Sequence, residues 1–191
     1  MIDPIARFEA VYARALAAEA ELPDAVTLAT ADRHGRPSAR VVLLKGVEDG
    51  AFVFYTNYES RKGHQLAENP FAALCFYWKS LGEQIRVEGR VEKIDPAASD
   101  AYFQTRPKLS QVAALASEQS RALSSREALE QRFEALRARY AEEPVPRPAH
   151  WGGYRLIPDR IELWTNGEHR LHHRDLYELE AGAWRHTLLN P

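Results

Sequence analysis

The chain has 191 residues, of which 45% are hydrophobic and 27% charged, a composition that fits a folded globular protein and excludes a disordered one. The net charge of -2 excludes a general attraction to nucleic acid or anionic membranes, so any anion binding must come from local clusters of Arg and Lys. The single cysteine, Cys75, excludes an internal disulfide framework and a zinc site built from several cysteines.

The first part of the chain predicts a helix followed by a run of strands. Asp3-Pro4 is typical of a helix start, and apolar residues follow at helical spacing. We therefore expect an amphipathic helix over residues 3–21, within an N-terminal helical segment 1–22. The pattern then alternates as in β-strands, with turn signals between the segments. Strands are expected at 25–31, 38–47 and 51–57, a short helix at 59–69, and a strand pair at 71–80 and 83–95.

From residue 96 the pattern becomes helical and then returns to strands. Within a helical insertion over 96–143, helices are expected at 96–105 and 124–143, and PVPRP (144–148) reads as an extended linker. The C-terminal region 150–191 predicts strands at 153–158, 160–166, 169–180 and 183–189. Strands interrupted by helices favour a mainly β fold with appended helices (α+β), built on a β-barrel and not on a doubly wound parallel sheet.

No composition shift divides the chain, so we expect a single domain over residues 1–191. The N-terminus has no signal-peptide pattern, and no apolar run approaches the length of about 20 residues that a membrane span needs. A cytoplasmic location is therefore expected.

Near the C-terminus, the stretch NGEHRLHHR gathers three of the seven histidines between arginines. On a strand, His169 and His173 would share a face roughly 13 Å apart, too far to ligate one ion, so no metal site is expected. Arg170, His172 and Arg174 would share the opposite face, where two permanent cations beside a titratable ring suit an anionic, planar ligand. An edge strand with solvated charges fits the same pattern.

Two other stretches carry donors suited to phosphate. In YESRKG, Arg61 and Lys62 stand side by side at a predicted strand-to-helix turn, beside the free N–H groups of a helix start. In YFQTRPKLSQ, Tyr102, Arg106 and Ser110 follow at four-residue spacing, although the proline between them breaks a continuous helix. Adjacent basic residues are also common on ordinary surfaces. No Gly-rich dinucleotide loop, Walker loop or nucleophile elbow is present in the sequence.

Together these segments resemble the pyridoxamine/pyridoxine 5'-phosphate oxidase (pyridoxal 5'-phosphate synthase) family, from about residue 25 to the C-terminus. The matching blocks are RVVLLK (40–45), FYTNYESRKGHQL (54–66), QIRVEG (84–89), YFQTRPKLSQ (102–111), EQS (118–120), HWGGYRL (150–156), ELW (162–164) and HRLHHR (169–174). Each block alone is weak, but their order and spacing are specific. The resemblance implies an FMN-binding split β-barrel of Greek-key topology, and a homodimer with FMN at the subunit interface.

The resemblance also implies site residues. The FMN-binding positions are Arg40, Val41, Val42, Leu43, Leu44, Lys45, Tyr55, Thr56, Arg61, Lys62, Gln84, Gln119, Ser120, Trp164 and Arg174. The substrate-binding positions are Lys45, Tyr102, Arg106, Ser110, Arg170, Leu171 and His172. Arg170 and His172 are the expected catalytic pair, which would hold the substrate ring over the flavin, with His172 a candidate proton acceptor. Simple alternation puts Arg40 and Lys45 on opposite faces of one strand; a bulge or contributions from both subunits would resolve this conflict.

The reaction that the resemblance implies is FMN-dependent oxidation of pyridoxamine or pyridoxine 5'-phosphate to pyridoxal 5'-phosphate, with O2 reduced to H2O2, in vitamin B6 biosynthesis or salvage. The implied partners are B6 phosphate esters, O2 and a second copy of the chain, without nucleic acid or membrane. One alternative is a flavin oxidase of the same fold that acts on another ring, as in the phenazine pathway. Another is a non-catalytic carrier of flavin or pyridoxal phosphate. A heme- or F420-binding split barrel matches the phosphate motifs less well.

Several positions depart from the family pattern. His173 replaces a residue that is usually acidic, and Thr165-Asn166 replaces a commoner Gln-Gly pair. Glu83 stands where a basic residue is frequent, and Leu188 where an arginine is common. The chain also starts close to its first helix and lacks the upstream basic and aromatic segment that covers the active site in some members, so lid-like closure is an open question. We expect these departures to alter affinity and to leave the function in place.

Overall fold

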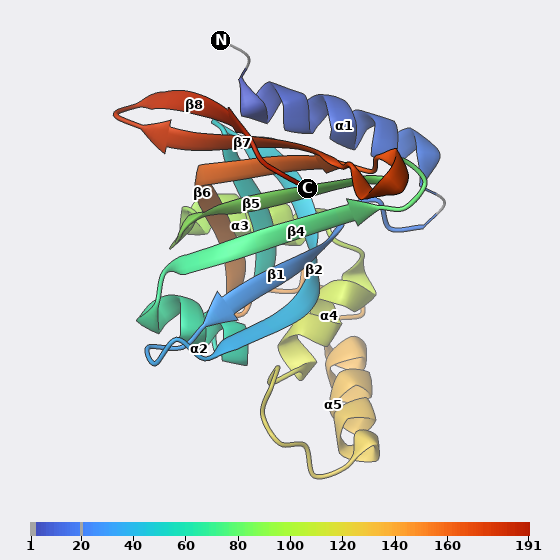
Figure 1. Cartoon of the computed structure of the whole chain (residues 1–191). Coiled ribbons are helices and arrows are strands. Elements are labelled where there is room, and N and C mark those ends of the chain that lie inside the picture. Colours follow the sequence, from blue (N-terminus) through green and yellow to red (C-terminus); the bar gives the residue numbers. More distant parts are fainter. Residues whose placement is uncertain (1–2, 20) are drawn as a thin grey trace.

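The structure is a computed structural model that describes residues 3–19 and 21–191 (Figure 1). Its helices are α1 (Pro4–Ala18), α2 (Arg61–Glu68), α3 (Pro96–Thr105), α4 (Lys108–Ala116) and α5 (Arg126–Arg139), with a 3-10 turn, η1 (Glu168–Arg170). Its strands are β1 (Ala25–Ala31), β2 (Pro37–Glu48), β3 (Ala51–Asn57), β4 (Phe71–Trp78), β5 (Glu83–Lys93), β6 (Trp151–Thr165), β7 (His173–Glu180) and β8 (Ala183–Leu188). The expected mainly β fold with appended helices is confirmed. One position of the predicted helix 3–21, residue 20, lies outside the described residues.

The strands form one antiparallel sheet in the order β3-β2-β1-β4-β5-β6-β7-β8. Strand β6 also pairs with β3, so the strands from β3 to β6 close into a six-stranded barrel, and β7 and β8 extend from its rim. Strand β4 lies beside β1, while β1, β2 and β3 follow one another as hairpins; this order is the Greek key. The predicted Greek-key β-barrel is therefore confirmed.

The barrel core is built from the alternating apolar residues of the strands and from one face of α1, which lies across the sheet in Figure 1. Asp3 caps α1 as predicted, because its carboxylate accepts a hydrogen bond from the backbone N–H of Ile5 at 2.9 Å. Phe8 of α1 inserts between Phe52 and Phe76, with ring centroids 4.7 and 5.1 Å away. Burying such a ring contributes about 1.5–3 kcal/mol, so α1 is an integral part of the fold.

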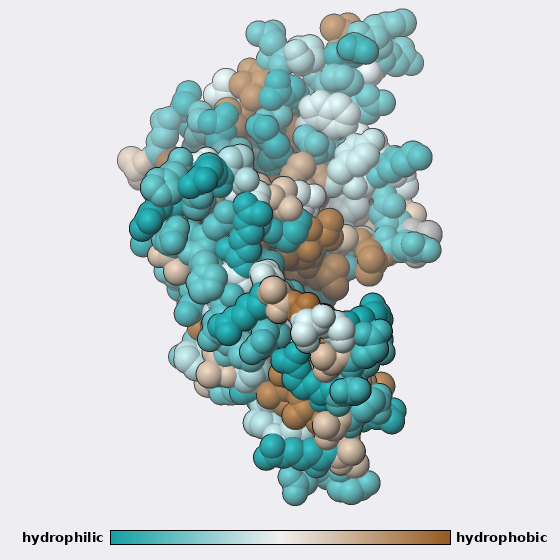
Figure 2. Space-filling view, turned by 90° about the horizontal axis from the view of Figure 1, so that it is seen from below, coloured by the Kyte–Doolittle hydropathy of each residue, from teal (hydrophilic) through white to brown (hydrophobic). Residues whose placement is uncertain are grey.

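A second apolar cluster holds the helices α3, α4 and α5 beside the start of β6. It consists of Phe103, Val112, Val145 and Trp151, with Phe133 of α5 packed on its edge. Val145 is buried there, so the segment 144–148 is docked on the protein, although it forms neither helix nor strand. The face seen in Figure 2 is mostly hydrophilic, with hydrophobic residues gathered near its middle. Among the described residues, no helix is both long and apolar enough to cross a membrane.

Two elements differ from the prediction at prolines. The sequence does not predict helix α4, because proline is a helix breaker. Pro107 does end α3, but it is also the N-cap position of α4. The predicted strands 153–158 and 160–166 are one continuous strand, β6. The pairing of β5 with β6 shifts register beside Pro158, so the Pro158-Asp159 step forms a bulge and not a turn.

The predicted strand 169–180 is wrong at its beginning. His169 and Arg170 adopt left-handed backbone conformations, with φ of 55° and 66°, and belong to η1. Extended pairing starts only at His173. Strand alternation therefore does not place Arg170, His172 and Arg174 on one face, because the backbone is not extended between them.

Candidate functional site

A cavity of about 740 Å³ lies beside β2 and β3, within the usual size range of small-molecule sites. Its walls come from β2, β3, the start of α2, the junction of α3 and α4, the segment after α4, and the start of β6. Its lining residues are Ser38, Ala39, Arg40, Val41, Val42, Leu43, Lys45, Tyr55, Thr56, Arg61, Lys62, Tyr102, Arg106, Pro107, Ser110, Gln119, Ser120 and Trp151. Five of them are cationic and, within the described part of the chain, none is Asp or Glu. The cavity is therefore suited to anions.

The cavity brings together most of the residues that the sequence predicted, including Arg40 and Lys45 of β2. Strand β2 pairs Leu44 with Phe54 and then Gly46 with Val53, so Lys45 is the extra residue of a β-bulge. The bulge resolves the conflict with simple alternation, because Arg40 and Lys45 both reach the same cavity. Leu44 is different: its side chain is buried in the barrel core and does not line the cavity.

The break at the proline between α3 and α4 does not separate the phosphate donors predicted there. Tyr102 lies on α3, Arg106 is the C-cap position of α3, and Ser110 lies in the first turn of α4. All three line the cavity. The turn between α3 and α4 therefore brings the three side chains to one cavity, although no continuous helix joins them.

An aromatic stack forms one wall of the cavity. The rings of Tyr55 and Tyr102 lie 3.9 Å apart, and Trp151 stacks on Tyr55 at 5.3 Å. The Arg106 guanidinium lies 4.6 Å from the centroid of the Trp151 ring. Trp151 was not predicted as a site residue. It stands in the matched block HWGGYRL, and a bulky aromatic just before two glycines at a strand start was the available signal.

One nitrogen atom of the Arg106 guanidinium is buried in an unusual way. Its Nη1 is buried and has no hydrogen-bond partner among the described residues. Burial lowers the pKa of the Arg106 guanidinium, while nearby Tyr102 opposes this shift. A buried N–H without a partner costs free energy, and an anionic oxygen in the cavity would satisfy it.

Lys62, at the start of α2, is a second buried cation. It is 8% exposed, and its Nζ donates hydrogen bonds to Gln119 Oε1 at 2.7 Å and to Ser60 Oγ at 3.0 Å. Burial, helped by the charge of Arg40, lowers the pKa of Lys62 to about 8. Both hydrogen-bond acceptors are neutral, so they stabilise the positive charge of Lys62 through their dipoles and do not neutralise it. A phosphate at this helix start would supply the missing negative charge.

Arg40 is likewise held only by neutral groups. Its Nη1 donates to Thr30 Oγ1 at 2.6 Å, and its Nη2 donates to Ser38 Oγ. Burial and the neighbouring Arg61 lower the pKa of the Arg40 guanidinium. Lys45 differs, because its Nζ forms an ion pair with a carboxylate oxygen of Asp24 at 2.9 Å.

The remaining predicted residues form a second group at the other end of the sheet. They are Gln84, Trp164, Arg170, Leu171, His172 and Arg174, and none of them is among the described residues that line the cavity. Trp164 pairs with Gln84 on β5 and with Arg174 on β7. The His172 ring lies 4.7 Å from Trp164, and its Nδ1 accepts a hydrogen bond from the backbone N–H of Gly167 at 3.2 Å. Within one chain the predicted site residues therefore form two separate groups.

A glycine shapes the turn that carries this second group. A Cβ atom at Gly167 would lie 2.0 Å from the backbone carbonyl oxygen of Leu171. No other residue fits that approach without moving the backbone, so Gly167 is required for the turn that presents Arg170 and His172. The turn is exposed at Arg170 and Leu171 and half-buried at His172.

Comparison with family models is consistent with this geometry. Residues 13–140 match the model described as "Pyridoxamine 5'-phosphate oxidase", and residues 151–191 match the "Pyridoxine 5'-phosphate oxidase C-terminal dimerisation region". The second match contains Trp164, His172 and Arg174, which belong to the group of predicted residues that lies away from the cavity.

Individual proteins agree with the family models. The chain is 54% identical to proteins named pyridoxine/pyridoxamine 5'-phosphate oxidase from Myxococcus xanthus (strain DK1622) and Paraburkholderia phymatum, covering 99% of this chain and 92% and 89% of theirs. Among solved structures, it resembles PhzG from Burkholderia lata 383 in complex with tetrahydrophenazine-1-carboxylic acid, with a TM-score of 0.94 and 34% identity over 99% of this chain and 93% of that one. A pyridoxamine 5'-phosphate oxidase-related, FMN binding protein from Nostoc punctiforme shares the fold, with a TM-score of 0.76 and 20% identity over 96% and 97% of the two chains. With a cationic cavity, a dimerisation-region match and full-length relatives in agreement, the chain belongs to the pyridoxamine 5'-phosphate oxidase family.

Proposed function

We propose that the protein is an FMN-dependent oxidase that converts pyridoxamine 5'-phosphate or pyridoxine 5'-phosphate to pyridoxal 5'-phosphate, with O2 reduced to H2O2. The observation that carries the proposal is the cavity with five cationic side chains and no lining carboxylate in the described residues, in which Arg106 keeps a buried, unpartnered N–H. Two phosphates, one on the cofactor and one on the substrate, account for so many cations in a chain of net charge -2.

The cofactor phosphate belongs at the start of α2. Arg61 and Lys62 lie there, and Gln119 reaches Lys62 with its amide oxygen. Lys62 is buried and, in the part of the chain that the structure describes, has no carboxylate partner, so a phosphate dianion fits its charge. FMN, when bound, supplies the two-electron oxidation of the substrate and the return of those electrons to O2. The protein supplies binding, orientation and exclusion of water.

The substrate phosphate belongs to the group formed by Lys45, Tyr102, Arg106 and Ser110. Arg106 is stacked on Trp151, so its guanidinium is already oriented before a ligand arrives. Lys45 shares its charge between Asp24 and the incoming phosphate. For the amine substrate the overall balance consumes O2 and water and gives the aldehyde, ammonia and H2O2; the alcohol substrate requires no water and gives no ammonia.

In this proposal, the group of predicted residues away from the cavity completes the site in the cavity of a second copy of the chain. Gln84, Trp164 and Arg174 then complete the flavin site of the partner, while Arg170, Leu171 and His172 cover its substrate ring. The match of residues 151–191 to a dimerisation region supports this arrangement. It also explains why one chain contains both groups of residues but does not bring them together.

His172 serves as a hydrogen-bond donor in this proposal, and not as the proton acceptor expected from the sequence. Its Nδ1 accepts the hydrogen bond from the Gly167 N–H, so a neutral ring carries its single proton on Nε2. Nε2 can then donate to a substrate oxygen or nitrogen and help to fix the ring. Arg170 on the same turn adds a permanent positive charge.

A second candidate is a flavin oxidase that acts on a phenazine-type ring. The solved structure of PhzG, bound to tetrahydrophenazine-1-carboxylic acid, favours it through a TM-score of 0.94 at 34% identity. That ligand carries a carboxylate and no phosphate. The phosphate-binding set Lys45, Tyr102, Arg106 and Ser110 instead favours a phosphorylated substrate.

The test is an absorbance spectrum of the purified protein, followed by anaerobic mixing with each B6 phosphate ester and by a peroxide assay in air. We expect a flavin spectrum that bleaches with pyridoxamine 5'-phosphate, and stoichiometric H2O2 on readmission of air. Bleaching with a reduced phenazine carboxylic acid, but with neither B6 ester, would favour the second candidate. A flavin that no substrate bleaches would indicate a non-catalytic carrier.

A further inference from the structure

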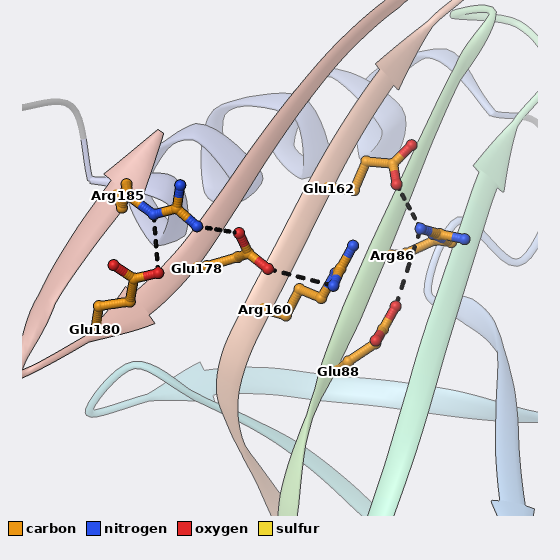
Figure 3. Close-up of polar contacts among 7 residues, drawn as sticks. All are labelled: Arg86, Glu88, Arg160, Glu162, Glu178, Glu180 and Arg185. Atoms are coloured by element: carbon orange, nitrogen blue, oxygen red, sulfur yellow. Dashed lines mark hydrogen bonds and ion pairs between the residues drawn. The ribbon is translucent and has the colours of Figure 1, made fainter. Parts of the chain in front are cut away.

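Glu162 of β6 is a buried carboxylate between arginines of the two neighbouring strands. It is 3% exposed; its Oε1 accepts a hydrogen bond from Arg174 Nε at 2.8 Å, and its Oε2 accepts one from Arg86, which Figure 3 draws. Burial alone would raise the pKa of Glu162, but the hydrogen bonds and charges of Arg174 and Arg86 lower it. Glu162 is therefore ionised at neutral pH, and each carboxylate oxygen has a cationic partner.

These contacts determine how Arg174 is presented. Glu162 holds its Nε, and the backbone carbonyl oxygen of Asn190 accepts a hydrogen bond from Nη1 at 2.8 Å. Neither hydrogen bond uses Nη2, so one edge of a fixed guanidinium is left for a ligand. Trp164 lies two residues after Glu162 on the same face of β6 and pairs directly with Arg174.

We propose that Glu162 is a positioning residue for the flavin site, which orients Arg174 toward FMN bound in the partner's cavity. The inference rests on the proposed function, because that function assigns Arg174 to FMN. A carboxylate is needed here for two reasons. It accepts hydrogen bonds from two arginines at once, and its charge allows two guanidinium groups to lie on either side of β6 without strong repulsion.

The same sheet provides a matched control, Glu178 of β7. Its carboxylate also joins two arginines, accepting hydrogen bonds from Arg160 Nη1 at 3.3 Å and from Arg185 Nη2 at 2.8 Å (Figure 3). Neither arginine belongs to the residues assigned to FMN or substrate. Glu178→Gln thus makes the same chemical change as Glu162→Gln, one strand away, without touching Arg174.

The experiment compares four variants: Glu162→Gln, Glu178→Gln, Arg174→Ala and the double variant Glu162→Gln/Arg174→Ala. FMN is titrated into each flavin-free protein by quenching of flavin fluorescence, and the visible circular dichroism of the bound flavin is recorded. We expect Glu162→Gln to weaken FMN binding roughly ten-fold, equivalent to about 1.4 kcal/mol, and to change the dichroism spectrum. Glu178→Gln should change neither. In the Arg174→Ala background, Glu162→Gln should add no further loss, because the group through which it acts is already gone.

Three results would overturn the inference. Equal losses in Glu162→Gln and Glu178→Gln would mean that both carboxylates only stabilise the sheet. A loss that adds fully to that of Arg174→Ala would mean that Glu162 acts by another route. Unchanged FMN affinity in Arg174→Ala would refute the assignment of Arg174 in the proposed function, and the positioning role with it. The first two results leave the proposed function intact.

Thermal unfolding of each flavin-free variant shows whether it folds. If Glu162→Gln does not fold, Glu162→Asp takes its place, because it keeps the charge and shortens the side chain by one methylene. A positioning role then predicts weaker FMN binding and a shifted dichroism spectrum for Glu162→Asp. Affinity and spectrum equal to those of the parent protein would overturn it.

Discussion

Replacing Arg106 by alanine tests the substrate half of the cavity. In the proposed complex its buried Nη1, which has no partner in the described residues, donates a charge-assisted hydrogen bond to the substrate phosphate. Such a bond contributes about 1.5–3 kcal/mol, so Arg106→Ala should raise KM for pyridoxamine 5'-phosphate on the order of 10- to 100-fold. FMN affinity should stay unchanged, because the cofactor phosphate is assigned to Arg61 and Lys62.

The assay is the rate of peroxide formation as a function of substrate concentration, with FMN titrated separately into the flavin-free variant. Arg126→Ala on α5, which removes a largely exposed arginine paired with Glu130, is the control for loss of a positive charge. Unphosphorylated pyridoxamine is the control substrate, because its KM should hardly respond to Arg106→Ala. A loss of the same size for both substrates, or a loss of bound FMN with KM unchanged, would refute the reasoning.

Three further predictions concern the cofactor and the turn. Arg61→Ala should weaken FMN binding on the order of ten-fold and leave KM nearly unchanged; a fluorescence titration that gives the parent affinity contradicts its role. FMN affinity should fall as the pH rises past about 8, because only protonated Lys62 attracts the phosphate, and this fall should be absent in Lys62→Met. In the unfolded chain Lys62 keeps its proton to a higher pH than in the folded protein. The free energy of unfolding of the flavin-free protein should therefore increase, relative to Lys62→Met, as the pH rises above 8. Denaturant unfolding at two pH values checks the direction of this change. Finally, His172→Gln should retain more turnover than His172→Asn, because the longer amide places a donor near the position of Nε2; equal losses would argue against a donor role.

The strands and helices that follow local rules were predictable from the sequence. Strands β1 and β3 begin and end where alternation and turn residues placed them, and α3 spans the predicted residues 96–105. In these segments the side-chain pattern and the turn chemistry point to the same structure. The residue types around Arg106 indicate phosphate donors, but the helix break made their spacing look unfavourable. Their assignment to a substrate phosphate comes from the family resemblance and stays a prediction.

What the sequence could not reveal depends on backbone irregularities. The bulge at Lys45 changes which face a side chain occupies; RVVLLK suggests it only through the conflict between Arg40 and Lys45, for which contributions from both subunits were an equal explanation. Strand β6 likewise continues through a bulge beside Pro158, although a proline usually ends a strand. His169 and Arg170 adopt left-handed conformations that alternation does not anticipate. The separation of the predicted residues into two groups depends on which strands pair, which is a long-range property of the fold.

Strand β6 closes the barrel by pairing with β3 near Trp151, and near Trp164 it carries the residues that the proposed arrangement lends to the other subunit. On the proposed arrangement, a lesion in the cavity and a lesion on the lent turn damage different combinations of the two chains. A mixed dimer with one lesion of each kind then contains one doubly damaged centre and one intact centre. Two inactive alleles produced in the same cell can in this way restore each other, so genetic complementation between them does not imply two separate genes.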